Sequence, residues 1–321
     1  MLFPMNEEYI GGIVKLWNKE LGDSFPMRAA LFKQNSLDDV NVLKNGSLVA
    51  LNQSGEVIGF VIVKIWSEEI GIELNKEIGW IQALLVDSNY RNRGIGSTLL
   101  ERAEKELVSK QIKIIRIGSD PWHYFPGIPS HCDEAMSWFE KKGYKNDGKE
   151  YDLVCQYNEA RIDPVPQFVH VTFGLLKIEE KIPFLSFMNR CFPGRWEYEA
   201  ISYFERGGTG REFVILKREN ELIGFCRIND DDSPFIAQNV YWSPAFETPL
   251  GGIGPLGIDP EERKKGYGIA IVEAGIAYLR KRNIHQIIID WTGLVDFYGK
   301  LGYEVRTTYL KYSKRMGGSD R

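Results

Sequence analysis

A hexapeptide pattern that occurs twice in this 321-residue chain has the composition of an anion site. The copies read Arg91-Asn-Arg-Gly94-Ile-Gly96 and Arg263-Lys-Lys-Gly266-Tyr-Gly268. Each follows an apolar run typical of a strand and precedes an apolar periodicity typical of a helix. The first N–H groups of a helix have no partner within it, and glycine lets a ligand approach the backbone closely. The two patterns therefore predict a duplicated phosphate-binding domain.

Two other phosphate-binding motifs do not account for these turns. A P-loop is excluded, because neither copy contains G-x-x-x-x-G-K followed by Ser or Thr. A dinucleotide fingerprint has Asp290 in its favour, since this residue lies about 20 residues after the second turn, where a ribose-binding acid is expected. It fails because Leu99 and Ile271 replace the third small residue, and because hairpin-linked strands precede the turns. Two ordinary strand-to-helix turns with solvated basic side chains are the remaining alternative, which the repetition disfavours.

The same order of elements is expected in both halves of the chain. In the first half, the sequence predicts helices over residues 6–20, 94–109 and 134–142, a hairpin of strands 47–51 and 57–63, and strands over 80–86 and 113–117. In the second half, it predicts helices over 266–282 and 294–301, a hairpin of strands 213–217 and 222–227, and strands over 251–258 and 286–290. Gly143 and Gly302 fit helix C-caps. The predicted fold class is α/β, with a mixed sheet flanked by helices.

Three landmarks repeat in register and indicate a tandem duplication. They are the Gly-x-Gly of each turn, Ile58-Gly59-Phe60 with Ile223-Gly224-Phe225, and Lys142-Gly143-Tyr144 with Leu301-Gly302-Tyr303. We therefore expect an N-terminal domain over residues 1–157, a linker over 158–167 and a C-terminal domain over 168–321. Pro164 and Pro166 mark the linker, because proline resists both helices and central strands.

Composition disfavours several classes of function. The 40 Lys and Arg residues against 44 Asp and Glu residues give a formal charge of −4, which offers no general argument for nucleic-acid binding. The four cysteines and four histidines lack metal-ligand spacing, so we expect no metal and reduced thiols. The sequence shows neither a signal peptide nor an apolar run of about 18 residues, so we expect a soluble, cytoplasmic protein without a membrane partner.

The two turns resemble those of the GNAT superfamily of acyl-CoA-dependent N-acyltransferases, whose signature is a strand, then R/Q-x-x-G-x-G/A, then a helix. Both hexapeptides match this signature, and the strand ends Leu84-Leu-Val86 and Leu256-Gly-Ile258 precede them. The segment Phe297-Tyr-Gly-Lys-Leu-Gly-Tyr303 is similar to the closing F-Y-x-K-L-G-F/Y element of the family. The resemblance covers almost the whole chain as two tandem GNAT-like domains.

The resemblance implies a coenzyme A site in each half, with acetyl-CoA as cosubstrate. Backbone amides of the turns would hold the pyrophosphate, and the pantetheine arm would lie along the edge of the preceding strand. In the first half, the implied coenzyme-binding residues are Leu84, Val86, Arg91, Asn92, Arg93, Gly94, Ile95 and Gly96. In the second half, they are Leu256, Ile258, Arg263, Lys264, Lys265, Gly266, Tyr267, Gly268 and Ile269.

The resemblance also implies direct attack of an amine on an acyl thioester, with a tyrosine that donates a proton or hydrogen bond to the leaving thiolate. Tyr298 occupies that position, and the alternative is an aromatic side chain packed on the sheet. Phe139 stands there in the first half and lacks the hydroxyl, which puts catalysis by that half in doubt unless Tyr124, His123 or Cys132 serves as donor. The C-terminal domain is therefore the predicted catalytic domain.

No general base stands out in the sequence. Glu247, Glu197 and Glu199 are the carboxylates expected near the acceptor, with Glu247 as the assigned candidate and a water chain as the alternative. Two segments differ between the copies. The Pro- and aromatic-rich stretch 120–129 is predicted to be a wall or lid of a binding site, or else a loop packed at the domain junction. Residues 230–248 are expected to frame the acceptor.

The predicted function is N-acetyl transfer from acetyl-CoA to a primary amine of a small molecule or peptide. One alternative is a coenzyme-A-binding sensor or scaffold in which neither site turns over. Another is an acyltransferase that uses a longer acyl group or a hydroxyl acceptor.

Overall fold

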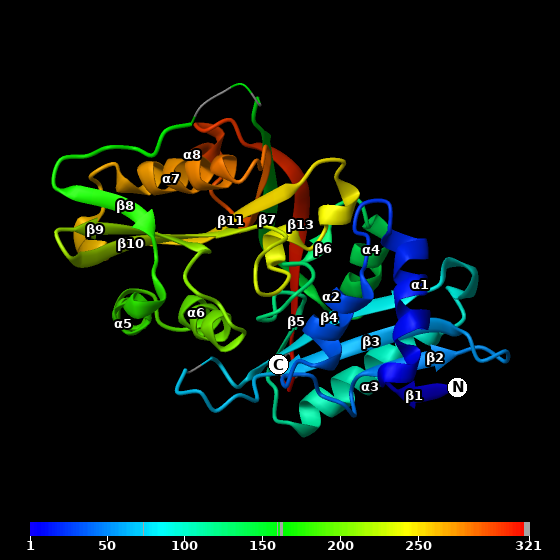
Figure 1. The fold of residues 1–321 in the computed structure, drawn as a ribbon. Coiled ribbons are helices and arrows are strands. Elements are labelled where there is room, and N and C mark those ends of the chain that lie inside the picture. The colour runs from blue at the N-terminus through cyan, green and yellow to red at the C-terminus, as the bar shows by residue number, and fades with distance from the viewer. Residues whose placement is uncertain (73, 159, 161–162, 318–321) are drawn as a thin grey trace. The chain divides into compact units, whose positions relative to one another are not determined.

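The computed structural model describes residues 1–72, 74–158, 160 and 163–317, and it divides the chain into two compact units (Figure 1). Unit 1 comprises Met1–Ile70, Leu74–Glu150 and Thr307–Arg321, and unit 2 comprises Gly71–Glu73 and Tyr151–Arg306. Residues 307–317 thus group with the first unit, although they follow the predicted linker 158–167 in the sequence. Residues 159, 161 and 162 of the predicted linker lie outside the described part of the chain.

Unit 1 is an α/β unit built on a mixed sheet. Its elements are β1 (Leu2–Pro4), η1 (Glu7–Tyr9), α1 (Ile10–Leu21), α2 (Ala29–Phe32), the π-helix η2 (Lys33–Leu37), β2 (Leu48–Leu51), β3 (Val57–Ile65), β4 (Ile78–Val86), η3 (Ser88–Tyr90), α3 (Ile95–Ser109), β5 (Ile114–Ile117), β6 (Ile128–Pro129) and α4 (Asp133–Lys141). Strands β7 (Lys145–Gln156) and β13 (Glu304–Arg315) contribute residues to both units. The strand order in unit 1 is β1-β2-β3-β4-β5-β13, and β4 and β5 run parallel.

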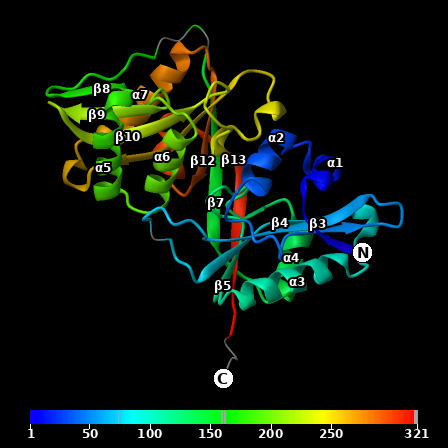
Figure 2. The same ribbon diagram turned by 60° about the horizontal axis from the view of Figure 1, so that its bottom comes forward.

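Helices cover both faces of the unit 1 sheet (Figure 2). Helix α3 packs on β3 and β4, and α1 packs on β3. The α3 side holds the main core, in which Leu99, Ala103 and Leu107 meet β-branched residues of the central strands. These three residues belong to the apolar stripe that the sequence predicts for this helix. The predicted elements of the first half are thus confirmed, with ends shifted by one or a few residues.

Unit 2 repeats this plan. Its elements are β8 (Val171–Leu175), η4 (Ile178–Glu180), α5 (Lys181–Cys191), α6 (Arg195–Glu205), β9 (Phe213–Arg218), β10 (Glu221–Asn229), η5 (Gln238–Val240), η6 (Ser243–Ala245), β11 (Leu250–Ile258), η7 (Pro260–Glu262), α7 (Tyr267–Lys281), β12 (Gln286–Thr292) and α8 (Val295–Gly299). The strand order is β7-β12-β11-β10-β9-β8, and β11 and β12 run parallel. Helix α7 covers one face of this sheet, and α5 and α6 lie over the other (Figure 1).

In each unit the pairing of the two parallel central strands stops before the longer strand ends. In unit 1 the last paired residues of β4 and β5 are Ile81 and Ile117. In unit 2 the last pair is Ile253 of β11 with Ile289 of β12. We call the point just beyond each last pair the strand fork. Each fork coincides with a register shift in the neighbouring antiparallel pair, between β3 and β4 in unit 1 and between β10 and β11 in unit 2.

Candidate functional site

The two basic turns have nearly the same backbone conformation. The second residue of each hexapeptide lies in the left-handed region, with φ of 60° at Asn92 and 66° at Lys264. The first glycine of each is the N-cap of the following helix, with φ and ψ of 81° and −7° at Gly94 and 84° and −6° at Gly266. Glycine suits these two positions because a positive φ strains residues that carry a Cβ. Duplication therefore extends from the sequence to the dihedral angles.

An arginine side chain fastens each turn to the strand before it. Arg91 Nε donates to the backbone oxygen of Val86 at 3.1 Å, and Arg263 Nε donates to that of Ile258 at 3.1 Å. The first arginine of the hexapeptide thus has a structural role in both units. In both units the Nε of this arginine is engaged by the protein backbone.

Each turn is also tied to the first long helix of its unit through an aspartate that sequence reasoning missed. Asp87 accepts from the N–H of residue 89 at 2.9 Å and pairs with Lys19 of α1 at 2.6 Å. Asp259 accepts from the N–H of residue 261 at 3.0 Å and pairs with Arg190 of α5 at 2.7 Å. The same spacing from the hexapeptide in both copies was the available signal.

The second glycine of each turn leaves room for a ligand. A Cβ built on Gly96 would lie 3.5 Å from Trp138, and one built on Gly268 would lie 3.8 Å from Phe297. Both are ordinary van der Waals contacts, so packing within the protein does not require glycine at either position. An approaching phosphate would require it, because the helix N-terminus directs its unpaired N–H groups there. The turns therefore leave space for an anion at the helix N-terminus.

The other predicted coenzyme residues lie around these turns. Leu84, Val86, Leu256 and Ile258 lie on β4 and β11 beyond the forks, and Ile95 and Ile269 lie in the first turns of α3 and α7. Lys264 is exposed. Arg93 donates to the oxygen of Asn89 at 3.0 Å, and Lys265 pairs with Glu262 at 2.9 Å. Tyr267 is buried against Phe168, with ring centroids 5.5 Å apart.

The strand fork of unit 2 has no side chain on its β11 branch. The residue beyond Ile253 is Gly254, and Pro255 follows with no N–H to pair with β12. On the other branch, the residue beyond Ile289 is Asp290. A Cβ built on Gly254 would lie 3.6 Å from Asp290 Oδ1, so the carboxylate lies beside this glycine. Asn239 donates from Nδ2 to the oxygen of Gly254 at 3.3 Å.

Tyr298 lies in the core on the α7 side of this fork. It is 5% exposed and belongs to the cluster that α7 forms with β9 to β12. Burial, followed by the charges of Cys226 and Asp290, raises the pKa of Tyr298 above its ordinary value. The phenol therefore keeps its proton over the physiological range and can serve as a hydrogen-bond donor.

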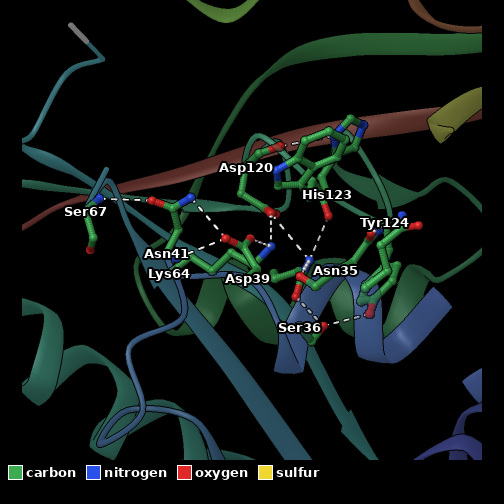
Figure 3. A network of polar contacts seen from close by, with 12 residues as sticks. Asn35, Ser36, Asp39, Asn41, Lys64, Ser67, Asp120, His123 and Tyr124 are labelled. Atoms are coloured by element: carbon green, nitrogen blue, oxygen red, sulfur yellow. Dashed lines mark hydrogen bonds and ion pairs between the residues drawn. The ribbon is translucent and has the colours of Figure 1, made fainter. Parts of the chain in front are cut away.

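The strand fork of unit 1 is filled by side chains of its own unit (Figure 3). The residue beyond Ile81 is Gln82, which is 3% exposed. Its Nε2 donates to the backbone oxygens of Trp122 at 2.8 Å and Asn35 at 3.2 Å, and its Oε1 accepts from Ser36 Oγ at 2.8 Å. The β5 branch contributes Gly118 at the equivalent place. In unit 1 the side chain is on the first parallel strand and the glycine follows the second. In unit 2 the glycine is on the first parallel strand and the side chain is on the second.

A buried lysine between two aspartates completes the network in unit 1. Lys64 is fully buried, and its Nζ lies 2.7 Å from Asp39 Oδ2 and 2.7 Å from Asp120 Oδ2. Asn41 donates to Asp39 at 3.0 Å and accepts from the N–H of Ser67 at 2.9 Å. Buried charges are tolerated when they are paired and hydrogen-bonded, as they are here. Sequence reasoning missed this group, because its members are spread from residue 35 to residue 124.

Two of the three alternative proton donors of unit 1, Tyr124 and His123, are buried. Phe139 is buried where Tyr298 lies in unit 2, and its ring meets that of Tyr144 as Tyr298 meets Tyr303. Tyr124 is 3% exposed and its hydroxyl is bonded to Ser36 Oγ at 2.6 Å. His123 is buried, with Nδ1 3.1 Å from the oxygen of Asp120. Burial raises the pKa of the Cys132 thiol.

The predicted acceptor carboxylates are not brought together. Glu199 is buried and pairs with Arg195 at 2.7 Å, and Glu197 accepts from Asn189 at 2.8 Å. Glu247 is exposed and precedes β11. It lies in the bend that leads into this strand.

The two divergent segments have become parts of their units. The stretch 120–129 is buried in unit 1, where Trp17 of α1 packs on Tyr124 and Phe125 at ring distances of 5.1 and 5.7 Å. Trp122 of the same stretch accepts from Gln82, so this loop forms part of the filling of the fork. The stretch 230–248 lies in unit 2 and includes η5, whose Asn239 contacts Gly254.

The fold and turns define a class of protein: paired α/β units, each with a strand-turn-helix anion site next to a fork between parallel strands. The model of the Acetyltransferase (GNAT) family matches residues 13–124 and 182–303. The chain therefore belongs to the GNAT acetyltransferase family, with two copies of the domain in tandem.

Comparisons with individual proteins agree with this family. The chain is 36% identical over 137 residues to a mycothiol acetyltransferase of Thermobispora bispora, and the aligned segment covers 38% of this chain and 40% of that protein. It is 22% identical over 291 residues to the mycothiol acetyltransferase of Amycolatopsis mediterranei, which covers 81% of each. The solved structure of a GCN5-related glucosamine N-acetyltransferase region in a fungal multi-domain GH3 β-N-acetylglucosaminidase superposes with a TM-score of 0.84 and 25% identity. That match covers 98% of this chain and 38% of the fungal chain, so this chain spans less than half of that relative.

No helix among the described residues is both long enough and apolar enough to span a membrane. No cluster of three or more His, Cys, Asp or Glu side chains within the described ranges is arranged to hold a metal ion.

Proposed function

We propose that this protein transfers an acetyl group from acetyl-CoA to a primary amine by direct attack of the amine on the thioester. The observation that carries the proposal is the coincidence in unit 2 of a phosphate-binding turn, a strand fork without a side chain on one branch, and a buried tyrosine beside that fork. Unit 2, which contains most of the predicted C-terminal domain 168–321, is on this proposal the seat of the reaction. Unit 1, which contains most of residues 1–157, has the turn but a filled fork and no equivalent tyrosine.

The residues of unit 2 have separate tasks in this reaction. The amides of residues 263–268 hold the pyrophosphate, and the edge of β11 from Gly254 to Ile258 lines the path from the turn to the fork. Acetyl-CoA supplies the activated acetyl group. Tyr298 donates a hydrogen bond to the sulfur as the carbon–sulfur bond breaks. Its raised pKa makes complete proton transfer unfavourable, so its contribution is stabilisation of the developing thiolate.

An amino sugar is the first acceptor to consider. The fungal region is described as a glucosamine N-acetyltransferase, and it aligns with 98% of this chain. On the α6 side of unit 2, amide and charged side chains gather near the fork, among them Asn229, Asn239 and Arg195. Groups of this kind recognise hydroxyl and amino substituents. These features support a small hydroxylated amine in preference to a peptide.

The test is an acetyl-transfer assay with a panel of amines. The protein is incubated with acetyl-CoA and glucosamine, an aminoglycoside, a free peptide N-terminus or a lysine peptide, and thiol release and product mass are followed. We expect thiol release that depends on the amine, and a product that carries one acetyl group. Glucose in place of glucosamine tests the hydroxyl alternative, and propionyl-CoA tests a longer acyl group. Binding of acetyl-CoA without transfer to any amine would instead favour a sensor.

A further inference from the structure

Asp290 places a charged side chain at the strand fork of unit 2, beside Gly254. It follows the last paired residue of β12, Ile289. Ile287 and Ile289 belong to the core under α7, whereas Ile288 packs with Ala237 and Val240 of the opposite face. Side chains alternate along a strand, so Asp290 is directed to the side of η5 and α6. This is the face opposite to the core that holds Tyr298.

The surroundings of Asp290 are rich in negative charge. Asp152 of β7 and Glu199 of α6 face it with negative charge, and Arg195 of α6 faces it with positive charge. Tyr298 of α8 is close enough for the charge of Asp290 to affect its pKa. The Asp152 carboxylate accepts a hydrogen bond from the N–H of Trp291 at 3.0 Å. Glu199 forms an ion pair with Arg195. Both neighbouring carboxylates thus have a fixed partner.

These charges set the protonation of Asp290. Burial, followed by the charges of Asp152 and Glu199, raises the pKa of Asp290 to about 7, and Arg195 opposes that shift. A carboxylate with a pKa near neutrality is well suited to accept a proton and to release it again at physiological pH. An ordinary surface aspartate would be too weak a base for an ammonium group.

We propose that Asp290 is the general base of the acetyl transfer and takes a proton from the ammonium group of the acceptor. This inference rests on the proposed function and adds a residue to it. The ammonium gives one proton to the Asp290 carboxylate, and the nitrogen lone pair attacks the thioester carbonyl. The carbon–nitrogen bond forms, the carbon–sulfur bond breaks, and the thiolate leaves hydrogen-bonded to Tyr298. The nitrogen loses a second proton, so that one proton ends on the thiol and one passes through Asp290 to solvent.

The positions of Asp290 and Tyr298 match the two halves of this reaction. Tyr298 belongs to the core on the α7 side of the sheet, and Asp290 is directed to the α6 side, where the charges of Glu199 and Arg195 act on it. A base and a hydrogen-bond donor on opposite faces of the sheet attend the incoming nitrogen and the outgoing sulfur without interfering with each other. Glu199 forms an ion pair with Arg195, and Glu247 is exposed in the bend before β11.

The test compares wild type with Asp290→Asn, which keeps the shape and removes the charge. Glucosamine and acetyl-CoA are the substrates, and kcat/KM is measured across the pH range. In wild type we expect kcat/KM to rise with pH through about 7, as Asp290 loses its proton. In Asp290→Asn we expect a loss of about 100-fold near neutral pH and the disappearance of that limb. With a hydrazide acceptor, which is uncharged at neutral pH, the loss of kcat/KM in Asp290→Asn should be far smaller. With glucosamine, Asp290→Glu should keep more activity than Asp290→Asn.

Two measurements separate this role from a structural one. Asp152→Asn removes a neighbouring negative charge, so we expect the acid limb of the wild-type profile to move to lower pH. Because the folded pKa of Asp290 lies above its unfolded value, wild type should lose stability relative to Asp290→Asn as pH rises from about 4 to about 7, and the difference should then level off. Chemical denaturation across this range checks that the variant is folded.

The outcomes distinguish this role from the proposed function. Acetyl-CoA binding by calorimetry should be the same in wild type and in Asp290→Asn. An active wild type whose Asp290→Asn variant keeps both its rate and its pH profile would overturn the role of Asp290 alone. A wild type that binds acetyl-CoA and acetylates no amine would overturn the proposed function, and the role of Asp290 with it.

Discussion

The two strand forks of this protein have the same backbone origin and different contents. In unit 1 the β4 branch carries Gln82, which lies in a closed network with Lys64 and Asp120. In unit 2 the β11 branch carries Gly254, and the other branch carries Asp290. The turns that follow the forks, by contrast, agree to within a few degrees. The comparison teaches that duplication has retained the backbone conformation of the turns, while the side chains at the forks have diverged.

Loss of the buried lysine should have the largest effect, and it should fall on unit 1. Lys64→Met leaves Asp39 and Asp120 buried without their cation. We expect the free energy of unfolding to fall by about 3–5 kcal/mol, as when one partner of a buried ion pair is removed. Chemical denaturation measures this loss. The matched control is Lys113→Met, whose exposed pairing with Glu77 should be worth less than about 1 kcal/mol. Equal losses in the two variants would show that the network contributes nothing special.

Removal of the Tyr298 hydroxyl should slow turnover, whereas a change at the equivalent position of unit 1 should not. Tyr298→Phe should lower kcat by about 100-fold, because the thiolate loses its hydrogen-bond donor. Steady-state kinetics with acetyl-CoA and an accepted amine measure the change. The reciprocal variant Phe139→Tyr, in unit 1, should leave kcat at the wild-type value. Unchanged turnover in Tyr298→Phe would remove this tyrosine from the mechanism.

A methyl group on the second glycine of each turn tests which turn serves the reaction. Gly268→Ala and Gly96→Ala add a Cβ that meets only ordinary contacts within the protein, so both variants should keep wild-type stability. Gly268→Ala should raise the KM for acetyl-CoA by about tenfold, through weakened hydrogen bonds from the amides to the pyrophosphate. Gly96→Ala should leave it unchanged. The same increase in both variants would indicate that unit 1 takes part in turnover.

The smallest effect is expected where the two units agree. Arg263→Lys and Arg91→Lys each remove a hydrogen bond from Nε to a strand carbonyl. Each variant should lose about 1 kcal/mol of stability, because lysine cannot reproduce the guanidinium geometry. Thermal unfolding with and without acetyl-CoA measures both losses. A loss confined to the presence of acetyl-CoA would contradict the structural role and assign the arginine to the ligand.

Much of the fold could be read from the sequence because the responsible signals are local. Apolar periodicity indicated α3 and α7, and the hairpins and glycine caps lay close to their observed positions. Strands β7 and β13 were missed, since their exposed and half-buried residues are largely polar and lack the apolar alternation of a typical strand. Helices α5 and α6 were missed as well. Glu197 and Glu199 of α6 are buried, which disturbs the simple pattern of one apolar face.

The sequence by itself determined the duplication, the two glycine-containing basic turns and the position of Tyr298, because each depends on residue types at short, fixed spacing. The tertiary structure decided the contents of the forks. Lys64 meets Asp39 and Asp120 only because three separate segments converge, and the pKa of Asp290 is raised by burial and then by carboxylates on β7 and α6. Burial and charge act through space, so the difference between a filled fork and one that can carry chemistry is decided by the folded chain.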